Sequence, residues 1–472
     1  MQVTETLLIL YGIVNLIYFL IGKKAKRPFA YVGLGLIIIH LLLGEARWQM
    51  AAGYLVISVI IATQLFQRSA KKWIRVISSV AGLLLIALSG ALCYTLPVFT
   101  LPAPIGSYAV ASQSLYLKDD SRKEDITTDP SDVRELMVDV FYPVNGPVGN
   151  TLPYLKPEER LGFAMKYDLP PSAFSYLNQV KTHVLQNASP AEGAFPVLIF
   201  SPGYYTPASG YHSIIAEMVS HGFVVFSINH SYETMASHFP DGREIFFDQA
   251  YANQYNWSDA MGKAVNQFDI ATEAEKYEAI KAVNIANVGA NLSVERWSTD
   301  ISAVIDAMQE WNQDSSFPLT GQLKLDQIGA FGHSRGGASA INASLTDQRI
   351  KATANLDGAQ WGKVIQSKMS RPTAVISSAR STLYEVNKYI YHEAKGADFY
   401  DVVLANSGHS NFSDIPYMVR IPQLNEAGSI LPERATASFN GFILAFFQKH
   451  LEGKTADLSK VVASDGNLSW KE

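Results

Sequence analysis

A serine held between glycines is the residue in this sequence best suited to do chemistry. It lies in Gly332-His333-Ser334-Arg335-Gly336-Gly337, which contains the pattern Gly-x-Ser-x-Gly. A strand-like run, 326–331, leads into the pattern, and a run of small residues, 338–344, leads out of it. A sharp turn between a strand and a helix is the setting in which this pattern exposes a nucleophilic serine. We therefore predict such a turn at Ser334, with a glycine-rich turn that caps a helix as the alternative.

The serine needs partners elsewhere in the chain. A serine hydroxyl is a weak nucleophile, so it requires a base and a third group that orients the base. Asp357 follows the next predicted strand, in Asn355-Leu356-Asp357-Gly358, and His409 follows the last predicted strand, in a flexible loop. The order Ser334, Asp357, His409 is that of the catalytic triad in the α/β-hydrolase fold. We predict that these three residues form a triad.

Other residues compete for two of these roles. The more usual place for the acid is after the next strand, at 377–380, but no carboxylate occurs there before Glu385. Asp357 is therefore preferred, with a turn aspartate before glycine as the alternative; for His409 the alternative is an ordinary loop histidine. Four further histidines are expected to be structural, of which His230 ends a strand and could lie near the site: His212, His221, His230 and His392.

The developing negative charge on an ester oxygen requires two backbone N–H groups aimed at it. One is expected from Arg335, directly after the nucleophile. The other is expected from Tyr204, in the loop Ser201-Pro202-Gly203-Tyr204 that follows a predicted strand. Because the contribution is a backbone amide, replacing Tyr204 by Phe should be nearly harmless. An ordinary Pro-Gly turn is the alternative for this loop.

The elements that must position these residues alternate between strand and helix from Phe195 onward. Strands are expected at 197–200, 223–228, 328–331, 352–356, 373–377 and 400–404, and helices at 211–221 and 294–311. This alternation predicts an α/β fold, with a mostly parallel sheet flanked by helices. Ligands bind beyond the carboxyl ends of such strands, which is where the serine, the acid and the histidine fall.

Three further segments complete the predicted body. Runs 108–117 and 135–142 alternate like antiparallel strands, with a polar loop, 119–132, between them. Residues 150–192 have no firm period and are expected to cover the substrate entrance. Residues 232–291 are expected to form a cap over the pocket, with aromatic side chains that could bind acyl chains.

The first hundred residues are of another kind. Four apolar runs occupy 6–21, 29–43, 50–66 and 73–99. A spanning helix needs about 20 residues, so the first three are short and the fourth is ample. The runs are apolar on all sides, which favours a membrane over a buried bundle in a soluble domain. We predict four transmembrane helices in residues 1–100 and, after a short proline-containing linker, a catalytic domain in 101–472.

Charge gives the expected orientation. Residues 1–99 hold nine of the 38 Lys and Arg but only two of the 43 Asp and Glu. Most of these cations lie between the first and second runs or between the third and fourth: Lys23, Lys24, Lys26, Arg27, Arg68, Lys71, Lys72 and Arg75. Basic loops stay in the cytoplasm, so everything after about residue 101 is predicted to be extracytoplasmic. A cleaved signal peptide is not expected, since residues 1–5 carry no positive charge. His40, within the second run, is expected to be a packed histidine.

Composition excludes several function classes. The body is acidic and has no basic stripe, which argues against nucleic acid as a partner. Cys93 is the single cysteine, so neither a disulfide within the chain nor a cysteine metal cluster can form. No His-Glu-x-x-His or comparable ligand cluster occurs. No metal or organic cofactor is therefore expected.

From about residue 101 onward the chain resembles the plasma, isoform II-like, platelet-activating factor acetylhydrolases, a branch of the α/β-hydrolases. The resemblance is carried by 200–204, 220–223, 332–337, 355–357 and 409–414, and it extends to bacterial ester hydrolases of the branch at 134–138. It implies that the acid follows the strand after the elbow, as Asp357 does. Where the mammalian enzyme has His-Gly in the oxyanion loop, this chain has Pro202-Gly203, so the backbone donor is retained but the inference of phospholipid specificity from the resemblance is weakened. The apolar runs are not part of the secreted enzyme's pattern.

Together these observations predict a serine carboxylic-ester hydrolase that works through an acyl-enzyme on short or medium acyl esters or lipid esters, including sn-2 phospholipid esters. Its expected partners are that ester substrate and a membrane bilayer. An acyltransferase using the same triad is one alternative. A catalytically silent, membrane-anchored binding module is another.

Overall fold

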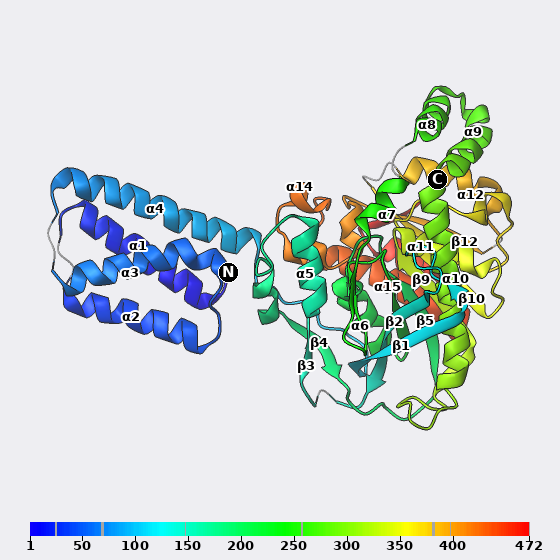
Figure 1. Ribbon diagram of the computed structural model, residues 1–472, viewed down its shortest axis with the longest axis horizontal. Coiled ribbons are helices and arrows are strands. Elements are labelled where there is room, and N and C mark those ends of the chain that lie inside the picture. Colours follow the sequence, from blue (N-terminus) through cyan, green and yellow to red (C-terminus); the bar gives the residue numbers. More distant parts are fainter. Residues whose placement is uncertain are drawn as a thin grey trace.

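The chain folds into a helical bundle and a larger α/β body, joined at one end of the bundle (Figure 1). The computed structural model describes residues 1–23, 26–67, 70–146, 148–255, 258–379, 383–396 and 398–471. Lys24, Arg68, Arg380 and the side chain of Glu385, which entered the sequence argument, lie outside the described residues.

The four apolar runs are helices, as predicted: α1 (Val3–Leu20), α2 (Arg27–Leu42), α3 (Ala51–Leu65, preceded by the 3-10 turn η1, Trp48–Met50) and α4 (Lys72–Thr95). Three segments are long and apolar enough to cross a membrane, namely α1, Trp48–Leu65 and α4, whereas α2 has only 16 residues. The fourth helix ends at Thr95, so residues 96–99 are not part of it. Phe99 packs instead among aromatic residues of the body, including Tyr154 and Tyr417.

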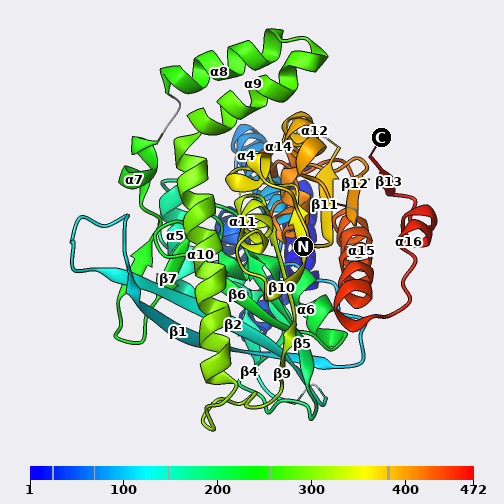
Figure 2. The same cartoon turned by 90° about the vertical axis from the view of Figure 1, so that its right-hand side faces the viewer.

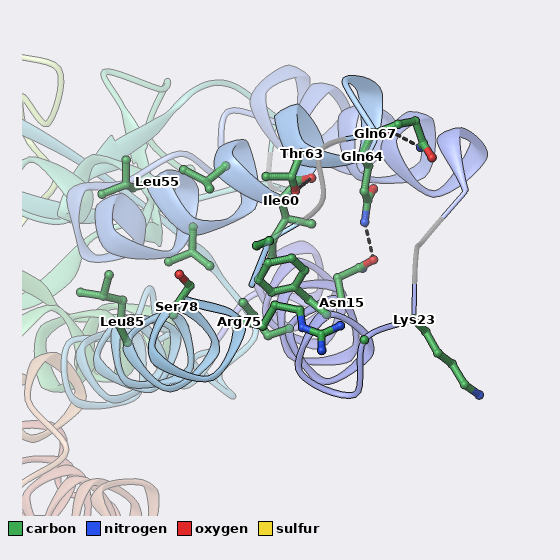
Figure 3. Close-up of a pocket in the computed structure, with 18 residues that line it drawn as sticks. Asn15, Lys23, Leu55, Ile60, Thr63, Gln64, Gln67, Arg75, Ser78 and Leu85 are labelled. Atoms are coloured by element: carbon green, nitrogen blue, oxygen red, sulfur yellow. Dashed lines mark hydrogen bonds between the residues drawn. The ribbon is translucent and has the colours of Figure 1, made fainter. Parts of the chain in front are cut away.

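Small and polar residues hold the bundle together. A Cβ at Gly12 would lie 2.3 Å from the Ile86 side chain, so the glycine lets α1 and α4 approach closely. Gln64 donates a 2.6 Å hydrogen bond to Asn15, which joins α3 to α1. A cavity of about 420 Å³ lies among α1, α3 and α4, with Arg75 and Lys23 at its outer end (Figure 3). Neither Ser334 nor His409 lines it.

The body is built on an eleven-stranded sheet with the order β13-β12-β11-β10-β9-β5-β6-β2-β1-β4-β3. The strands are β1 (Ala109–Lys123), β2 (Val133–Val144), β3 (Thr151–Pro153), β4 (Lys181–Gln186), β5 (Phe195–Ser201), β6 (Val224–Asn229), β9 (Leu323–His333), β10 (Ile350–Leu356), β11 (Thr373–Ser378), β12 (Phe399–Leu404) and β13 (Leu468–Trp470). Six neighbours, from β12 to β6, are parallel, while β2 joins antiparallel to both β6 and β1. The mostly parallel α/β sheet is as predicted.

Helices cover both faces of the sheet (Figure 2). On one face lie α6 (His212–Ser220) and α15 (Pro432–Glu452), whose apolar residues share a core with β5, β10 and β11. On the other lies α10 (Val288–Trp311), which packs with α11 (Arg335–Ser344) over β5, β6 and β9. Because both faces are buried, the central strands are continuously apolar. The short helices α13 (Ile415–Met418), α14 (Pro422–Asn425) and α16 (Leu458–Ser464), with the 3-10 turns η3 (Ala208–Tyr211), η4 (Lys363–Gln366) and η5 (His409–Phe412), complete this region.

Two expectations about boundaries were wrong. Residues 119–123, predicted as loop, belong to β1, which pairs with β2 as far as Asp119 and Arg134 before a bulge. The side chain of Arg122, tied to Asp119 and Asp300, holds the extended end of the strand against the body. Helix α10 begins six residues earlier than predicted, at Val288, because its first turns pack against neighbouring segments of the body.

Two inserted segments differ in where they lie. Residues 150–192 form β3, α5 (Pro157–Lys166), η2 (Ser175–Gln179) and β4, beside the bundle (Figure 1). Residues 232–291 form the hairpin β7 (Ala236–His238) and β8 (Glu244–Phe246), then α7 (Gln249–Gln254), α8 (Asp259–Ile270) and α9 (Glu273–Ala286). The α8–α9 pair packs its apolar face on α12 (Leu383–Ala394), through Phe268 and Tyr389 among others.

A buried charge network joins β2 to α10. The fully buried Arg134 donates to Asp300 at 2.7 Å and to Glu124 at 2.8 Å. Burial alone would raise the pKa of Asp300. The guanidinium of Arg134 and a hydrogen bond from His230 outweigh burial and hold this pKa well below its usual range.

Replacing Arg134 by Ala should lower the free energy of unfolding by about 3–5 kcal/mol, because the buried Glu124 would lose its counter-charge and the buried Asp300 would keep only Arg122. The control is Arg243→Ala, which removes a half-exposed ion pair with Glu135 and should cost less than about 1 kcal/mol. Chemical denaturation of the full chain in detergent measures both. Equal losses would contradict this account of the network.

Candidate active site

Ser334 lies on a sharp turn between β9 and α11, as predicted. Its φ of 56° and ψ of −123° are strained for a residue with a side chain. A Cβ at Gly332 would lie 2.3 Å from the carbonyl oxygen of Ser201, and one at Gly336 would lie 2.0 Å from the same atom. Both glycines are therefore needed for β5 to pass so close to the turn.

The structure brings the three predicted side chains together. His409 Nε2 lies 3.0 Å from Ser334 Oγ, and His409 Nδ1 lies 2.7 Å from Asp357 Oδ2. A carboxylate can only accept, so Nδ1 carries the proton and Nε2 is free to accept from the serine hydroxyl. Each residue follows a strand of the parallel sheet: β9, β10 and β12.

The more usual position for the acid, at 377–380, supplies a hydrogen-bond donor to Asp357. Ser378, at the end of β11, donates to Asp357 twice, from its backbone N–H at 2.7 Å and from its hydroxyl at 3.0 Å. Asp357 itself is buried and has a φ of 51°. The end of β11 therefore orients the acid and does not supply it.

Sequence reasoning missed His333, the residue just before the serine. Its Nε2 donates to the carbonyl of His409 at 3.0 Å, and its Nδ1 accepts from the Tyr211 hydroxyl at 2.9 Å. The Tyr211 oxygen in turn accepts from the N–H of Gly203 at 2.9 Å. Burial, with the nearby His409, lowers the pKa of His333 well below its usual range, so it stays neutral. One histidine thus links the serine turn, the histidine loop and the predicted oxyanion loop. Its place inside the Gly-x-Ser-x-Gly pattern was the available signal.

The two predicted oxyanion donors lie beside the serine. Arg335 is the first residue of α11, and Tyr204 lines the same cavity as Ser334. Among the described residues, no hydrogen bond engages the backbone N–H of either one, whereas that of Gly203 is taken by Tyr211. The guanidinium of Arg335 stacks over the Tyr204 ring at 4.4 Å, which fixes the two segments relative to each other.

A cavity of about 970 Å³ opens from the serine and is mainly apolar. Its walls come from 163–174 and 415–426, together with Trp48 and Leu96 from the helical bundle. The segment 150–192 thus covers the site as expected. The predicted cap does not: none of the described residues of 232–291 lines the cavity. Its α8–α9 pair is held against α12 instead, and its Phe247 lies behind the site, stacked on Tyr205 at 3.6 Å and edge-on to Tyr204 at 5.2 Å.

A second serine–histidine–aspartate chain lies behind the oxyanion loop. His230 Nε2 is 2.8 Å from Ser201 Oγ, and His230 Nδ1 is 2.8 Å from Asp300 Oδ2. All three side chains are completely buried, so an ester cannot reach them. Because Ser201 directly precedes Pro202-Gly203, this chain fixes the end of β5. His230 is structural, as expected, and so is the buried His212, which bonds to the Tyr154 carbonyl.

No described group of three or more His, Cys, Asp or Glu side chains is placed to hold a metal ion.

Comparison with known proteins places this geometry in a family. The family described as platelet-activating factor acetylhydrolase, isoform II, matches residues 100–465. The chain belongs to this family. The match covers the α/β body and leaves out the helical bundle.

Two relatives show how far the likeness extends. A platelet-activating factor acetylhydrolase from Cavia porcellus is 27% identical over 268 residues, which is 54% of this chain and 58% of that protein. The chain thus spans little more than half of that relative's length. A probable 1-alkyl-2-acetylglycerophosphocholine esterase from Arthroderma benhamiae is 24% identical over 80% of this chain and 96% of its own.

A solved structure supports the fold. The ferulic acid esterase from Streptomyces cinnamoneus superposes with a TM-score of 0.62 at 23% identity, covering 80% of this chain and all of its own. The body is therefore an α/β-hydrolase fold, as the order of the triad predicted.

The histidine loop ends at a buried carboxyl, Asp414. Its backbone N–H donates to the Gly210 carbonyl at 2.8 Å, and its Oδ1 accepts weakly from the Ser213 N–H at 3.4 Å. Oδ2 has no hydrogen-bond partner among the described residues. Burial raises the pKa of Asp414 from 3.8 to about 7.

The raised pKa of Asp414 makes the stability of the fold depend on pH. Since the folded pKa is above the unfolded one, Asp414 stabilises the fold most below pH 4, and this stability is lost as pH rises to about 7. Between pH 5 and 8 the loss should be about 2–3 kcal/mol, and Asp414→Asn should remove it. Denaturation of both proteins at several pH values is the measurement, with the exposed Asp326→Asn as control. An unchanged slope in Asp414→Asn would refute the assignment.

Proposed function

We propose that this protein is a serine carboxylic-ester hydrolase that works through an acyl-enzyme. The observation that carries the proposal is the continuous chain of hydrogen bonds from Ser334 through His409 to Asp357 at a large apolar cavity. Family membership and the esterase fold of a structural neighbour support it.

In the proposed mechanism, His409 Nε2 takes the proton of Ser334 as the serine oxygen attacks the ester carbonyl. Asp357, held by Ser378, keeps His409 in the required tautomer and stabilises its charged form. The backbone amides of Tyr204 and Arg335 receive the oxyanion. His409 then gives its proton to the leaving alcohol. A water molecule, activated by the same histidine, releases the acid and restores the serine.

The cavity favours an ester with a large apolar part. Phe163, Phe174, Met418 and Val419 line it beside the serine. Lys166 is the one Lys or Arg side chain among the described lining residues, placed 4.4 Å from the Tyr205 ring. The cavity also carries one carboxylate, Glu426, so its lining favours the apolar part of a lipid ester, such as an sn-2 phospholipid, and not the charge of its head group. The names of the two relatives, an acetylhydrolase and a glycerophosphocholine esterase, agree with this class.

The triad is tested with an ester panel that includes sn-2 short-chain phospholipids. Ser334→Ala should abolish both cleavage and labelling by a fluorophosphonate, and Asp357→Asn should lower kcat on the order of 10⁴-fold. Tyr204→Phe is the matched control and should keep nearly full activity, because the proposed contribution of this residue is its amide. Ester cleavage that survives Ser334→Ala would refute the proposal. Acyl transfer to added alcohols in place of hydrolysis would instead identify an acyltransferase.

We further propose that the bundle crosses a membrane four times and holds the body outside the cytoplasm. The helix α2 is short, but it must cross because α1 ends far from the body and α3 begins beside it (Figure 1). The helix ends next to these loops, Arg27 at the start of α2 and Lys72 at the start of α4, lie away from the body, and the N-terminus lies at the body end (Figure 1), which agrees with basic loops in the cytoplasm.

A reporter fused to the C-terminus tests this topology. An alkaline phosphatase fusion, active only outside the cytoplasm, should be active, and a fluorescent protein that folds only in the cytoplasm should stay dark. A fusion after Arg75 should show the opposite pattern. A cytoplasmic C-terminus would overturn the orientation.

A further inference from the structure

We infer that the helical bundle forms one wall of the substrate site, and that an ester with a long apolar chain enters it from the bilayer, between the bundle and the body. The inference rests on the proposed ester hydrolysis and names where its substrate resides. It makes the bundle a determinant of specificity in addition to an anchor.

The first observation is the composition of the cavity wall. Trp48, at the start of the turn before α3, and Leu96, directly after α4, line the same cavity as Ser334 and His409. Both residues belong to the N-terminal region, outside the part of the chain that matches the family. The body alone would therefore leave this side of the cavity open.

The second observation is that the wall is fixed in place. Trp48 Nε1 donates to the carbonyl of Ala173 at 2.8 Å, and the N–H of Arg420 donates to the carbonyl of Thr95 at 3.0 Å. Both body segments, 163–174 and 415–426, also line the cavity. The bundle thus contacts the two segments that enclose the substrate.

A buried pair locks the bundle end itself. Arg47 and Glu5 are fully buried and joined by hydrogen bonds, and Arg47 also donates to the carbonyl of Leu96. This bond places the Leu96 backbone, and hence its side chain in the cavity wall. Beyond it, Phe99 and Leu101 continue into an apolar cluster with Tyr176 and Met418.

The third observation is that the mouth of the cavity lies at the height where the bundle would meet the membrane surface. The span Trp48–Leu65 begins at Trp48 itself, and tryptophan is enriched where a spanning helix meets the membrane surface. Three large apolar residues around the cavity are exposed to solvent: Tyr167, Leu169 and Leu424. The exposed fraction of Leu424 is 68%. Figure 1 shows α5 and α14, next to these residues, beside the end of the bundle. Apolar groups at this level would face lipid.

The chemistry of the substrate follows. Its ester carbonyl lies at Ser334, and its long chain lies along Trp48, Leu96 and Phe174 toward the bilayer. Such a molecule is a lipid ester of the leaflet next to the body. It reaches the serine without passing through water.

The test uses the full chain in proteoliposomes and two acetyl esters that differ only in the length of their second chain, one water-soluble and one resident in the bilayer. Trp48→Ala should lower the ratio of kcat/KM for the long ester over the short ester by about tenfold, because an apolar wall is lost. The control is Trp73→Ala, an exposed tryptophan on α4 outside this cavity, which should leave the ratio unchanged.

Trp48→Phe separates the wall from the junction hydrogen bond. It keeps an aromatic surface but loses the N–H that bonds to Ala173, and should keep most of the selectivity. If the ratio of kcat/KM for the long over the short ester is unchanged in Trp48→Ala, or falls equally in Trp48→Ala and Trp48→Phe, the proposal that the bundle forms a wall of the site is wrong. A further arm presents the long ester in vesicles that lack the enzyme, where cleavage should be slow; equal cleavage from separate vesicles would overturn entry from the bilayer.

The experiments distinguish a failure of the proposed ester hydrolysis at Ser334 from a failure of the proposed bundle wall. If ester hydrolysis at Ser334 is wrong, Ser334→Ala retains activity on both esters. If only the bundle wall is wrong, both esters are cleaved, Ser334→Ala abolishes both, and the ratio is insensitive to Trp48.

Discussion

The close passage of β5 behind the serine turn is the constraint on which this site depends. The carbonyl of Ser201 occupies the space that a side chain would need at Gly332 or Gly336. The turn can therefore be tight, and the loop that begins at Pro202 is brought directly beside Ser334. Because the amides proposed to receive the oxyanion belong to these two segments, their spacing is set by backbone contact and not by flexible side chains.

Two buried histidines maintain that arrangement from opposite sides. His230 holds the end of β5 through Ser201 and is itself held by Asp300, inside a network with Arg134. His333 ties the serine turn to Tyr211 and to the carbonyl of His409. Both are kept neutral, since burial lowers their pKa values, so each can donate one hydrogen bond and accept another. His409, in contrast, is partly exposed at the cavity.

The junction between bundle and body joins the apolar helices to the segments around Ser334. The linker residues Phe99 and Leu101 are buried in an apolar cluster of the body, so the linker packs against the body and is not a flexible connection. The segments that receive it, 163–174 and 415–426, are those that enclose the cavity. If the bundle spans a membrane as proposed, the same contacts set the direction from which a substrate reaches the serine.

Much of this could be predicted from the sequence because it depends on local patterns. Glycines around Ser334, strand-like runs and the order of Ser334, Asp357 and His409 each specify backbone geometry or chain order, and the parallel sheet then brings strand ends to one edge. The four apolar runs likewise predicted four helices. Where prediction failed, as at 119–123 and at the start of α10, contacts with distant residues such as Asp300 extended an element beyond its local signal.

The sequence by itself determined the fold and predicted Ser334, His409 and Asp357 as a triad, since residue type and order are enough for these. Only the tertiary structure decided which segments surround the serine. It left the expected cap at 232–291 out of the cavity wall, added 415–426 to the expected cover at 150–192, gave Ser378 and His333 their partners, and brought Trp48 and Leu96 to the cavity. The physical reason is that these contacts join residues separated in the chain, by 21 positions for Ser378 and Asp357 and by 125 for Trp48 and Ala173, and packing, not periodicity, selects them.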